Sequence, residues 1–592
     1  MRAFSLESLW RQVRAQREAF WRLNLYGVLA TLLLLPVPML IPLLIDEVLL
    51  GHPGHLSEWL GTLTGSREPW GLIAGVTLLV LTLRMTAFVA SARKTLYATQ
   101  IAQRIAYALR HRLLHHLERL ALSEYETLKS GGVVARSVQD VESVSAFASQ
   151  AVSTAVSASL MVLGIAGVMV WMEWRLALLV FVLNPLFLGV ARILGRKSAR
   201  LLRRRHEAYQ LYQELLSETL ELFVQVRASN QERRFFGILR HRAEEIERRS
   251  VEYGYKAALI QSTSSLLTAS AVDLFRAFGI AAVAYSGLSI GMMIAFLFYL
   301  STIVSPINQL LSLVIGWRNI HPSIERIDAL LSMPQEPLYP QRRDPFAGRM
   351  TVAVAVKDLH FAYREGPEIL HGISLDAKEG EKIALVGPSG SGKSTIAQLM
   401  VGFYPPLSGE ILYGGVPIRE IGLERLRSHV ALMLQESLFF NETIRMNLTL
   451  HRAIPEGRIW EALAMAQLEG FVRKLERGLD TPVGRNGIRL SGGQKQRLAI
   501  ARLILSDPQV VIFDEATSAL DGETEAKLYQ SLRPFLAGRT TIIIAHRETT
   551  IRQADHIYII DAGRVVAEGS YEALCSTGKL KNDFDGIRDQ TS

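Results

Sequence analysis

Residues 387–395 read Gly387-Pro388-Ser389-Gly390-Ser391-Gly392-Lys393-Ser394-Thr395, between a strand-like run at 382–386 and a helix-like run at 396–402. Glycines in such a loop let backbone N–H groups curve around a phosphate, and the following helix adds a favourable dipole. Lys393 would reach the β- and γ-phosphates of a nucleotide, and Ser394 would bind its Mg²⁺. A glycine-rich turn without a ligand is the alternative, but the strand–loop–helix context argues against it.

Two adjacent acids follow a second strand-like run. Residues 510–513 are continuously apolar, as in a buried strand, and Asp514 and Glu515 come directly after them. Downstream of a phosphate-binding loop, this pattern predicts Asp514 in the Mg²⁺ shell and Glu515 beside the attacking water. Phosphoryl transfer depends mainly on such positioning and on charge neutralisation.

A third element precedes a helix-like run at 495–505 and reads Leu490-Ser491-Gly492-Gly493-Gln494. Glycines at the start of a helix offer N–H groups to an anion. Ser491 could also be a simple N-cap without any ligand. In the same chain as the phosphate-binding loop, the anion-binding interpretation is favoured.

The first half of the chain is apolar in a different way. The chain is 49% hydrophobic, with a mean hydropathy of +0.19. A membrane-spanning helix needs about 20 apolar residues, and six segments qualify: 23–50, 70–90, 151–171, 174–194, 257–285 and 288–315. We predict a six-helix membrane domain over residues 1–333, a proline-rich linker over 334–350 and an α/β nucleotide-binding domain over 351–592.

Basic residues cluster beside these apolar segments, around 11–22, 93–136 and 192–256. Basic loops face the cytoplasm, so we expect both termini and the nucleotide-binding domain on that side. A formal net charge of +9 is also compatible with nucleic-acid binding. The basic residues lie beside the predicted spans, however, which favours interaction with the membrane. We therefore expect no nucleic-acid partner. The single cysteine, Cys575, excludes an intramolecular disulfide. We expect no cleavable signal peptide, because the first apolar run is too long.

The stretches 91–150 and 195–256 contain no proline and place apolar residues at helical spacing. Folded as two arms, about 60 residues would extend about 45 Å beyond the membrane. Four ionisable residues lie in or near the spans: Asp46, Arg84, Asp273 and Arg276. They could form interhelical pairs or line a polar cavity, and both interpretations stay open.

With these motifs in place, the chain resembles ATP-binding-cassette (ABC) exporters of the half-transporter type, with one membrane domain fused to one nucleotide-binding domain. Residues 490–494 resemble the signature sequence of that family. The resemblance implies a dimer in which the signature of one cassette caps ATP held by the phosphate loop of the other. It also implies ATP and Mg²⁺ as ligands and a lipid bilayer as the surroundings.

Further positions resemble the family residue by residue. Tyr363 is similar to the aromatic residue that stacks on adenine, and Gln435 to a glutamine that contacts Mg²⁺ or water and senses the membrane domain. Asp521 resembles a residue at the dimer seam, and His546 a histidine near the γ-phosphate. In the membrane half, 131–136 with Asp140 resembles the first coupling segment, and 222–232 the second.

One segment departs from the family pattern. Residues 483–487 read Val-Gly-Arg-Asn-Gly, where similar exporters commonly have Val-Gly-Glu-Arg-Gly. Arg485 and Asn486 therefore reverse the charge of a segment that contacts the coupling helices in the family. The change could alter the membrane-domain contact or be neutral.

The resemblance implies ATP-driven export by alternating access. No organelle-targeting segment is evident in the sequence, so we expect a bacterial inner-membrane location. An exporter-shaped importer, an ATP-dependent membrane regulator or channel, and a soluble ABC ATPase acting on nucleic acid are alternatives, and the six spans argue against the last. Glu515 and the complete signature favour a homodimer over a heterodimer. The substrate is not readable from the sequence, so a lipid, a drug-like amphiphile and a peptide all stay open.

Overall fold

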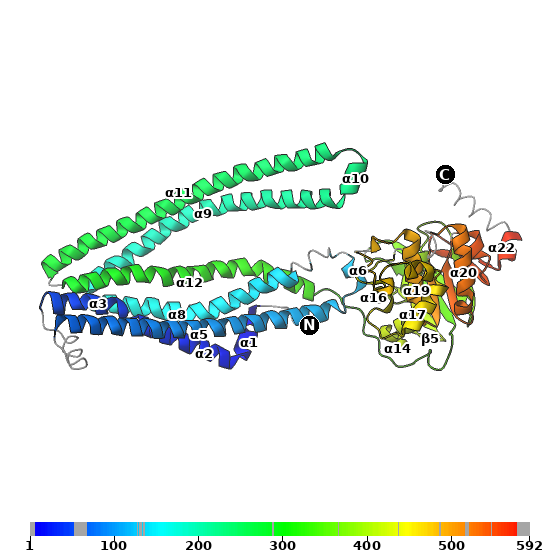
Figure 1. Cartoon of the computed structure of the whole chain (residues 1–592), viewed down its shortest axis with the longest axis horizontal. Helices are drawn as coiled ribbons and strands as arrows, with labels where there is room; N and C mark the ends of the chain where they lie inside the picture. Colours follow the sequence, from blue (N-terminus) through cyan, green and yellow to red (C-terminus); the bar gives the residue numbers. More distant parts are fainter. Residues whose placement is uncertain are drawn as a thin grey trace. The chain divides into compact units, whose positions relative to one another are not determined.

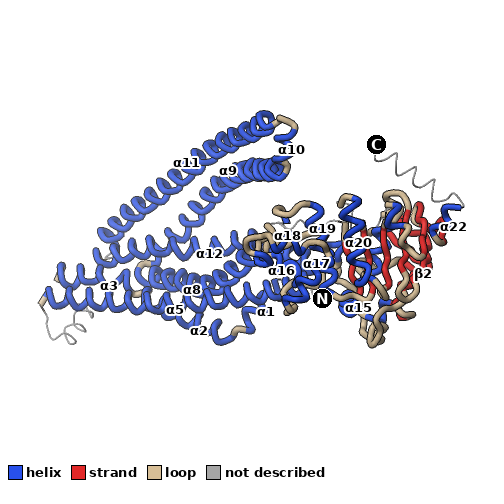
Figure 2. The backbone as a smooth tube through the Cα atoms, turned by 45° about the vertical axis from the view of Figure 1, so that its right-hand side comes forward, coloured by secondary structure: helices blue, strands red, loops and turns tan. Residues whose placement is uncertain are grey.

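We describe a computed structural model of the chain. The described residues are 6–51, 68–126, 128, 133, 136–286, 289–364, 366–435, 437–484, 487–515, 520–545 and 547–576. Contacts divide the chain into two compact units (Figure 1). The helical unit comprises 1–114 and 131–332, and the cassette unit comprises 115–130 and 333–592. Figure 2 shows that, within the described residues, strands occur only in the cassette unit.

The helical unit is built from long helices and a few short segments. They are α1 (Leu6–Ala15), α2 (Arg17–Leu34), α3 (Val37–Leu44), η1 (Ile45–Leu49), α5 (Pro69–Leu117, which continues past this unit), η2 (Arg136–Asp140), α8 (Val141–Met172), α9 (Trp174–Glu221), α10 (Phe223–Ala228), α11 (Glu232–Ser286) and α12 (Ile290–Leu331). Only Glu173 separates α8 from α9, and its side chain accepts a bond from the Arg175 N–H. Figure 1 shows α9 and α11 side by side, with α10 at their shared end.

Five of these helical stretches are long and apolar enough to cross a membrane: 17–49, 69–117, 136–172, 232–285 and 290–331. They overlap five of the six predicted spans. The remaining predicted span, 174–194, lies in α9, where the side chains of 182–199 fall outside the described residues.

A proline breaks the helix of the first span, and a distant tyrosine donates a hydrogen bond to a backbone carbonyl at the break. Pro36 separates α2 from α3, and the Met39 N–H bonds to the Pro36 carbonyl rather than to the Leu35 carbonyl. The Tyr299 hydroxyl of α12 donates to the Leu35 carbonyl at 2.7 Å. A carbonyl freed by a helix break must find such a partner inside a membrane, so this bond ties α12 to the kink.

The four ionisable residues of the spans occupy different environments. Asp46 is buried and accepts bonds from the Ser289 hydroxyl and from the Gly291 N–H at 2.8 Å, so it caps α12. Arg276 and Asp273 pair along one turn of α11 at 3.0 Å. Arg84 is exposed in the structure. Asp46 therefore bonds between helical segments without a cation partner among the described residues, and the pair of Asp273 and Arg276 lies within one helix, not between two.

The cassette unit contains two sheets. The strands are β1 (Val354–Ala362), β2 (Glu368–Ala377), β3 (Lys382–Val386), β4 (Ser408–Tyr413), β5 (Val416–Pro417), β6 (Val430–Met433), β7 (Val510–Asp514), β8 (Thr540–Ile544), β9 (His556–Asp561) and β10 (Arg564–Gly569). A four-stranded antiparallel sheet has the order β2-β1-β4-β5, and a six-stranded sheet has the order β10-β9-β3-β8-β7-β6. In the latter, β9, β3, β8, β7 and β6 run parallel.

Helices complete the cassette unit: α6 (Leu122–Tyr125), α13 (Lys393–Met400), α14 (Ile418–Ile421), α15 (Leu423–His429), α16 (Ile444–Thr449), α17 (Glu456–Met465), α18 (Glu469–Arg473), η3 (Gly478–Asp480), α19 (Gly492–Ser506), α20 (Gly522–Leu536), α21 (Glu548–Ile551) and α22 (Tyr571–Ser576). All five residues of β7 are buried, as expected for a parallel strand covered on both faces. One apolar cluster packs β7 against α17, α19 and α20, through residues such as Phe513, Leu498 and Leu528.

A short segment from the membrane half belongs to the cassette unit. The Tyr404 hydroxyl donates to the Glu126 carboxylate at 2.6 Å, and Arg364 pairs with Glu124 at 3.2 Å. The Ala121 N–H bonds to the Pro334 carbonyl at 3.1 Å. The predicted first coupling segment, 131–136, follows this contact in sequence, and 131, 132, 134 and 135 lie outside the described residues.

Candidate functional site

Four predicted motifs follow four adjacent strands of the six-stranded sheet. The phosphate loop follows β3, Asp514 ends β7, Gln435 comes shortly after β6, and the segment with His546 comes after β8. Because these strands are parallel neighbours, their carboxyl ends meet at one edge of the sheet, which is where open α/β sheets bind ligands. His546 itself lies outside the described residues.

The phosphate loop has the backbone that its glycines predict. Gly387 has φ +151°, and a Cβ at this position would overlap the carbonyl oxygen of Ile560. Gly392 has φ +102° and is the N-cap of α13. The Lys393 ammonium lies within the loop, 2.9 Å from the Gly387 carbonyl oxygen and 2.7 Å from that of Pro388.

We expect Gly387→Ala to distort this loop, because the added methyl group meets backbone rather than a movable side chain. Nucleotide affinity should fall at least about tenfold, a loss of about 1.4 kcal/mol, and the melting temperature of the cassette should fall with it. Both are measurable on the full chain with a fluorescent nucleotide and a thermal melt.

Gly538→Ala is the matched control for Gly387→Ala. Gly538 also has a positive φ, +75°, but nothing lies within 4 Å of an added Cβ. It therefore reports the backbone strain alone. Equal nucleotide affinity in the two variants would contradict the steric argument at Gly387.

The acidic groups and their polar partners form two contacts at this edge. The Ser394 hydroxyl donates to Asp514 Oδ1 at 3.1 Å, and the Gln435 amide donates to Glu515 Oε2 at 2.7 Å. Asp514 is only 5% exposed. Glu515 has φ +48°, an unusual conformation for a residue with a side chain, and such strain is typical of functional sites.

Burial and the nearby carboxylates change the pKa of Lys393 in opposite directions. Burial lowers the pKa of the Lys393 ammonium, and the carboxylates of Glu515 and Asp514 raise it in part. The two carboxylates thus favour the charged form of an otherwise desolvated lysine.

The donor set suits Mg²⁺ bound together with phosphates. Ser394 and Asp514 supply adjacent oxygen ligands of the type that Mg²⁺ prefers. Within the described part of the chain, no group of three His, Cys, Asp or Glu side chains could hold a metal by itself. Such a site fits an ion that takes its remaining ligands from substrate phosphates and water.

Tyr363 lies beside the helix that follows the phosphate loop. Its hydroxyl is 3.2 Å from Thr395 Oγ1 and donates to Gln398 Oε1 at 2.9 Å. Burial raises the pKa of Tyr363, although the bond with Thr395 lowers it in part. Its ring meets those of Phe361 and Tyr404 edge to face.

The signature residues start α19. Ser491 is the N-cap, its hydroxyl accepts from the Gln494 N–H, and the Gln494 side chain accepts from the Ser491 N–H. This capping box satisfies two of the donors that a helix start leaves free, and it leaves Gly492 and Gly493 at the first helical positions. In the described residues, no hydrogen bond or ion pair joins the signature to the phosphate loop of the same chain.

Asp521 lies at the start of α20. Nearby, an ion pair that the sequence did not indicate joins α20 to the segment after β8. Asp521 caps α20 through the Thr524 N–H at 2.9 Å, and that bond lowers the pKa of its carboxyl. Glu525, only 4% exposed, forms an ion pair with Arg547, the residue after His546. Arg547 also donates to the Leu520 carbonyl at 3.0 Å. The pair therefore joins the two chain segments that carry Asp521 and His546.

Arg547→Met should destabilise the cassette, because it leaves the Glu525 carboxylate buried without this cation. We expect a loss of about 3 kcal/mol, at the lower end of the range for a broken buried pair, since Arg547 is partly exposed. A thermal melt of the full chain measures it. The double variant Glu525→Gln/Arg547→Met removes the stranded charge and should recover part of the loss. A wild-type melt for Arg547→Met would contradict a structural role.

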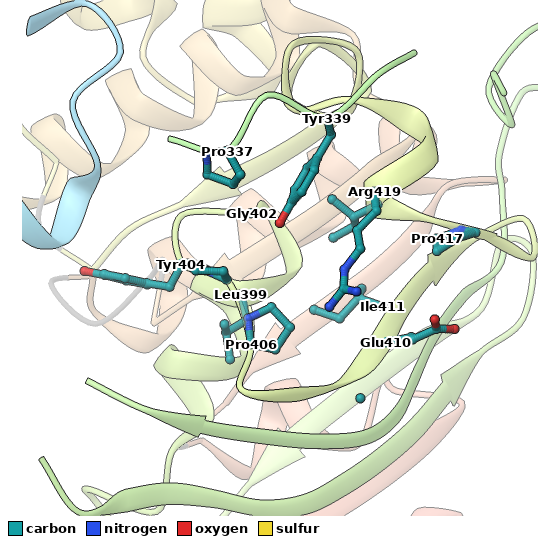
Figure 3. A pocket seen from close by; sticks show the side chains of 13 residues that line it. Pro337, Tyr339, Leu399, Gly402, Tyr404, Pro406, Glu410, Ile411, Pro417 and Arg419 are labelled. Atoms are coloured by element: carbon teal, nitrogen blue, oxygen red, sulfur yellow. The ribbon is translucent and has the colours of Figure 1, made fainter. Parts of the chain in front are cut away.

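A small cavity is lined in part by Tyr404, which contacts Tyr363. It has a volume of about 40 Å³ and is lined by residues that include Pro337, Tyr339, Tyr404 and Arg419 (Figure 3). No residue of the phosphate loop lines it. The volume suits ordered water rather than a nucleotide.

Arg485, Asn486 and 516–519 lie outside the described residues. The structure therefore brings together the phosphate loop, Asp514, Glu515, Gln435 and Tyr363. It describes the signature and Asp521 at separate helix starts.

Comparisons with known proteins agree with this architecture. Residues 40–307 match the ABC transporter transmembrane region and residues 370–518 match the ABC transporter family. An ATP-dependent lipid A-core flippase of Alcanivorax borkumensis is 31% identical over 81% of this chain and 82% of its own length. A Francisella tularensis protein of the same name is 33% identical over 81% and 79%.

A solved structure of a bacterial Atm1-family ABC exporter with ATP bound shares the fold. Its TM-score is 0.78 at 24% identity, and the alignment covers 99% of each chain. The sequence relatives match both the helical half and the cassette. The chain belongs to the ABC transporter family and is an ATP-hydrolysing transporter with its membrane region and cassette fused in one chain.

Proposed function

We propose that Lys393 and the N–H groups of residues 387–395 bind the phosphates of ATP, and that Glu515 orients the attacking water. Mg²⁺, when bound by Ser394 and Asp514, would neutralise charge between the β- and γ-phosphates. Gln435 would hold the Glu515 carboxylate and respond to the membrane domain. The meeting of these groups at the carboxyl ends of neighbouring parallel strands is the observation that carries the proposal.

We further propose that two copies of the chain form the working transporter. Ser491, Gly492, Gly493 and Gln494 would cap ATP on the partner's phosphate loop, with Asp521 at the seam and His546 near the γ-phosphate. Exposed apolar side chains on and beside α10 support an assembly, since Val224 is 81% exposed and Leu222 is also exposed. A homodimer is favoured because Glu515 and a complete signature occur in the same chain.

A cross-link tests the dimer. The cassette has a groove lined by apolar residues and three arginines, among them Leu434, Leu438 and Arg502. We infer that α10 of one chain docks in this groove of the other. In a Cys575→Ser background, Val224→Cys together with Leu434→Cys should give a covalent dimer on oxidation. Monomer alone, in a sample that hydrolyses ATP, would contradict this docking.

The direction of transport is proposed to be export, and the substrate an amphiphilic lipid. The named activity of the relatives, lipid A-core flippases, supports both. Six predicted spans with basic cytoplasmic loops support a bacterial inner-membrane location with the cassette in the cytoplasm.

Lipid movement in proteoliposomes tests this function. ATP added outside reaches only chains whose cassettes face outward, and for these chains the outer leaflet is the cytoplasmic one. Export should therefore move a fluorescent lipid inward and reduce the fraction that a membrane-impermeant quencher reaches. An increase in that fraction would indicate an importer. ATP-dependent lipid equilibration without accumulation would indicate a channel or scramblase. The Glu515→Gln chain is the control for ATP dependence.

A further inference from the structure

A pocket of about 530 Å³ lies between the junction of α1 with α2 and one face of α5. Its charged lining consists of Arg17, Arg22, Arg104 and Glu18, so two positive charges are in excess (three arginines against one glutamate). Glu18 pairs with Arg22 at 2.6 Å. The excess charge therefore resides mainly on Arg17 and Arg104.

The local structure gives this pocket defined walls. Gln16, with φ −92° and ψ 52°, interrupts the helix between α1 and α2 and turns the chain. On α5, Tyr97, Gln100 and Arg104 are three, four and seven residues apart, so they lie on one face. Arg22 donates to the Tyr97 hydroxyl at 3.3 Å, and its guanidinium lies 5.8 Å from the centre of that ring. This contact joins the two walls at one end of the pocket.

The pocket lies where both walls change from apolar to basic. Leu23 starts the first predicted span directly after Arg22, and Arg93 is the first cation after the predicted span at 70–90. Trp21 beside the pocket is 72% exposed. Tryptophan and arginine next to an apolar run are typical of the membrane–water interface, and on the orientation proposed above this is the cytoplasmic interface.

We propose that this pocket binds the phosphate of an anionic phospholipid headgroup from the cytoplasmic leaflet. Guanidinium groups match the oxygen geometry of phosphate and can bind it through two parallel hydrogen bonds. Arg17 and Arg104 supply these bonds from opposite walls, and Gln100 offers an amide to the glycerol or headgroup oxygens. The lipid remains bound here as part of the assembled protein.

Binding to the purified full chain tests the proposal without ATP or transport, so its failure is distinct from failure of the proposed transport activity. Native mass spectrometry can count bound dioleoyl phosphatidylglycerol, dioleoyl phosphatidylcholine and inorganic phosphate. Phosphatidylglycerol should be retained in preference to the zwitterionic lipid. Arg17→Gln/Arg104→Gln should weaken it about 25-fold, or about five-fold for each charge removed.

Two further variants make the result decisive. Arg14→Gln/Arg112→Gln removes two charges from α1 and α5 outside the pocket lining and should leave phosphatidylglycerol binding unchanged. Gln100→Glu places an anion in the pocket at an exposed position that does not threaten the fold, and it should also weaken binding. Thermal melts establish that each variant is folded.

Three results would overturn the proposal. An equal loss in the control pair would assign the effect to general charge. Unchanged binding in both Arg17→Gln/Arg104→Gln and Gln100→Glu would place the lipid elsewhere. Binding of inorganic phosphate that displaces phosphatidylglycerol would assign the pocket to a soluble phosphate instead of the membrane.

Discussion

Replacing Glu515 by glutamine is expected to lower ATP turnover by about 10²- to 10⁴-fold, the range that a positioned general base contributes. The substitution keeps the size of the side chain and removes the charge that would polarise the attacking water. The strained backbone at Glu515 and its contact with Gln435 hold this side chain at the end of β7. Nucleotide binding does not need the charge, so ATP affinity should be retained.

Phosphate release by the chain in lipid nanodiscs measures ATP turnover, and binding of a fluorescent nucleotide measures ATP affinity separately. Glu476→Gln is the matched control, because it makes the same change at an exposed position after α18. It should hydrolyse ATP at the wild-type rate. Turnover by Glu515→Gln within tenfold of wild type would exclude Glu515 as the group that activates water.

Lys393→Ala is expected to weaken ATP binding by about 10- to 100-fold and to reduce turnover to background. The estimate corresponds to the loss of a charge-assisted hydrogen bond, about 1.5–3 kcal/mol. The ammonium lies among the carbonyls of the phosphate loop, where it is placed to reach a bound phosphate.

The same variant should not destabilise the nucleotide-free chain. Burial lowers the pKa of Lys393, so its charged form costs stability at pH values below the unfolded-state pKa, and in full below the folded-state pKa. The alanine variant removes this cost together with the bonds to the Gly387 and Pro388 carbonyls that offset it. The melting temperature should therefore change little, and that of the exposed control Lys474→Ala should be unchanged. A large fall in melting temperature would show that Lys393 is structural, and the loss of binding would then need another explanation.

Much of this site follows from the sequence because its parts are local. The phosphate loop is continuous from 387 to 395, and the acids directly follow an apolar strand. Strand, loop and helix order is then enough to predict that Lys393, Asp514 and Glu515 meet. The predicted spans are likewise apolar runs whose length exceeds what a soluble helix needs.

Other features depend on contacts that no local pattern encodes. Helix α6 is only four residues long, and its attachment to the cassette rests on Tyr404 and Arg364, more than 200 residues away. The pairing of Glu525 with Arg547 crosses from α20 to the segment after β8. The sequence left Asp46 between an interhelical pair and a polar cavity, and its bonds to the start of α12 join positions more than 240 residues apart.

The place of residues 115–130 in the cassette unit also constrains how force passes through the chain. The backbone crosses between the units at 114–115, 130–131 and 332–333. The crossing at 332–333 leads directly into residues 333–592, whereas the other two hold residues 115–130, which bond to the rest of the cassette through Glu124 and Glu126. A twist of the cassette would therefore act on α12 through the backbone and on α5 through these noncovalent contacts. A protease cut within 334–350 would sever the backbone to the rest of the cassette, which would then keep its attachment through the noncovalent contacts of Glu124 and Glu126.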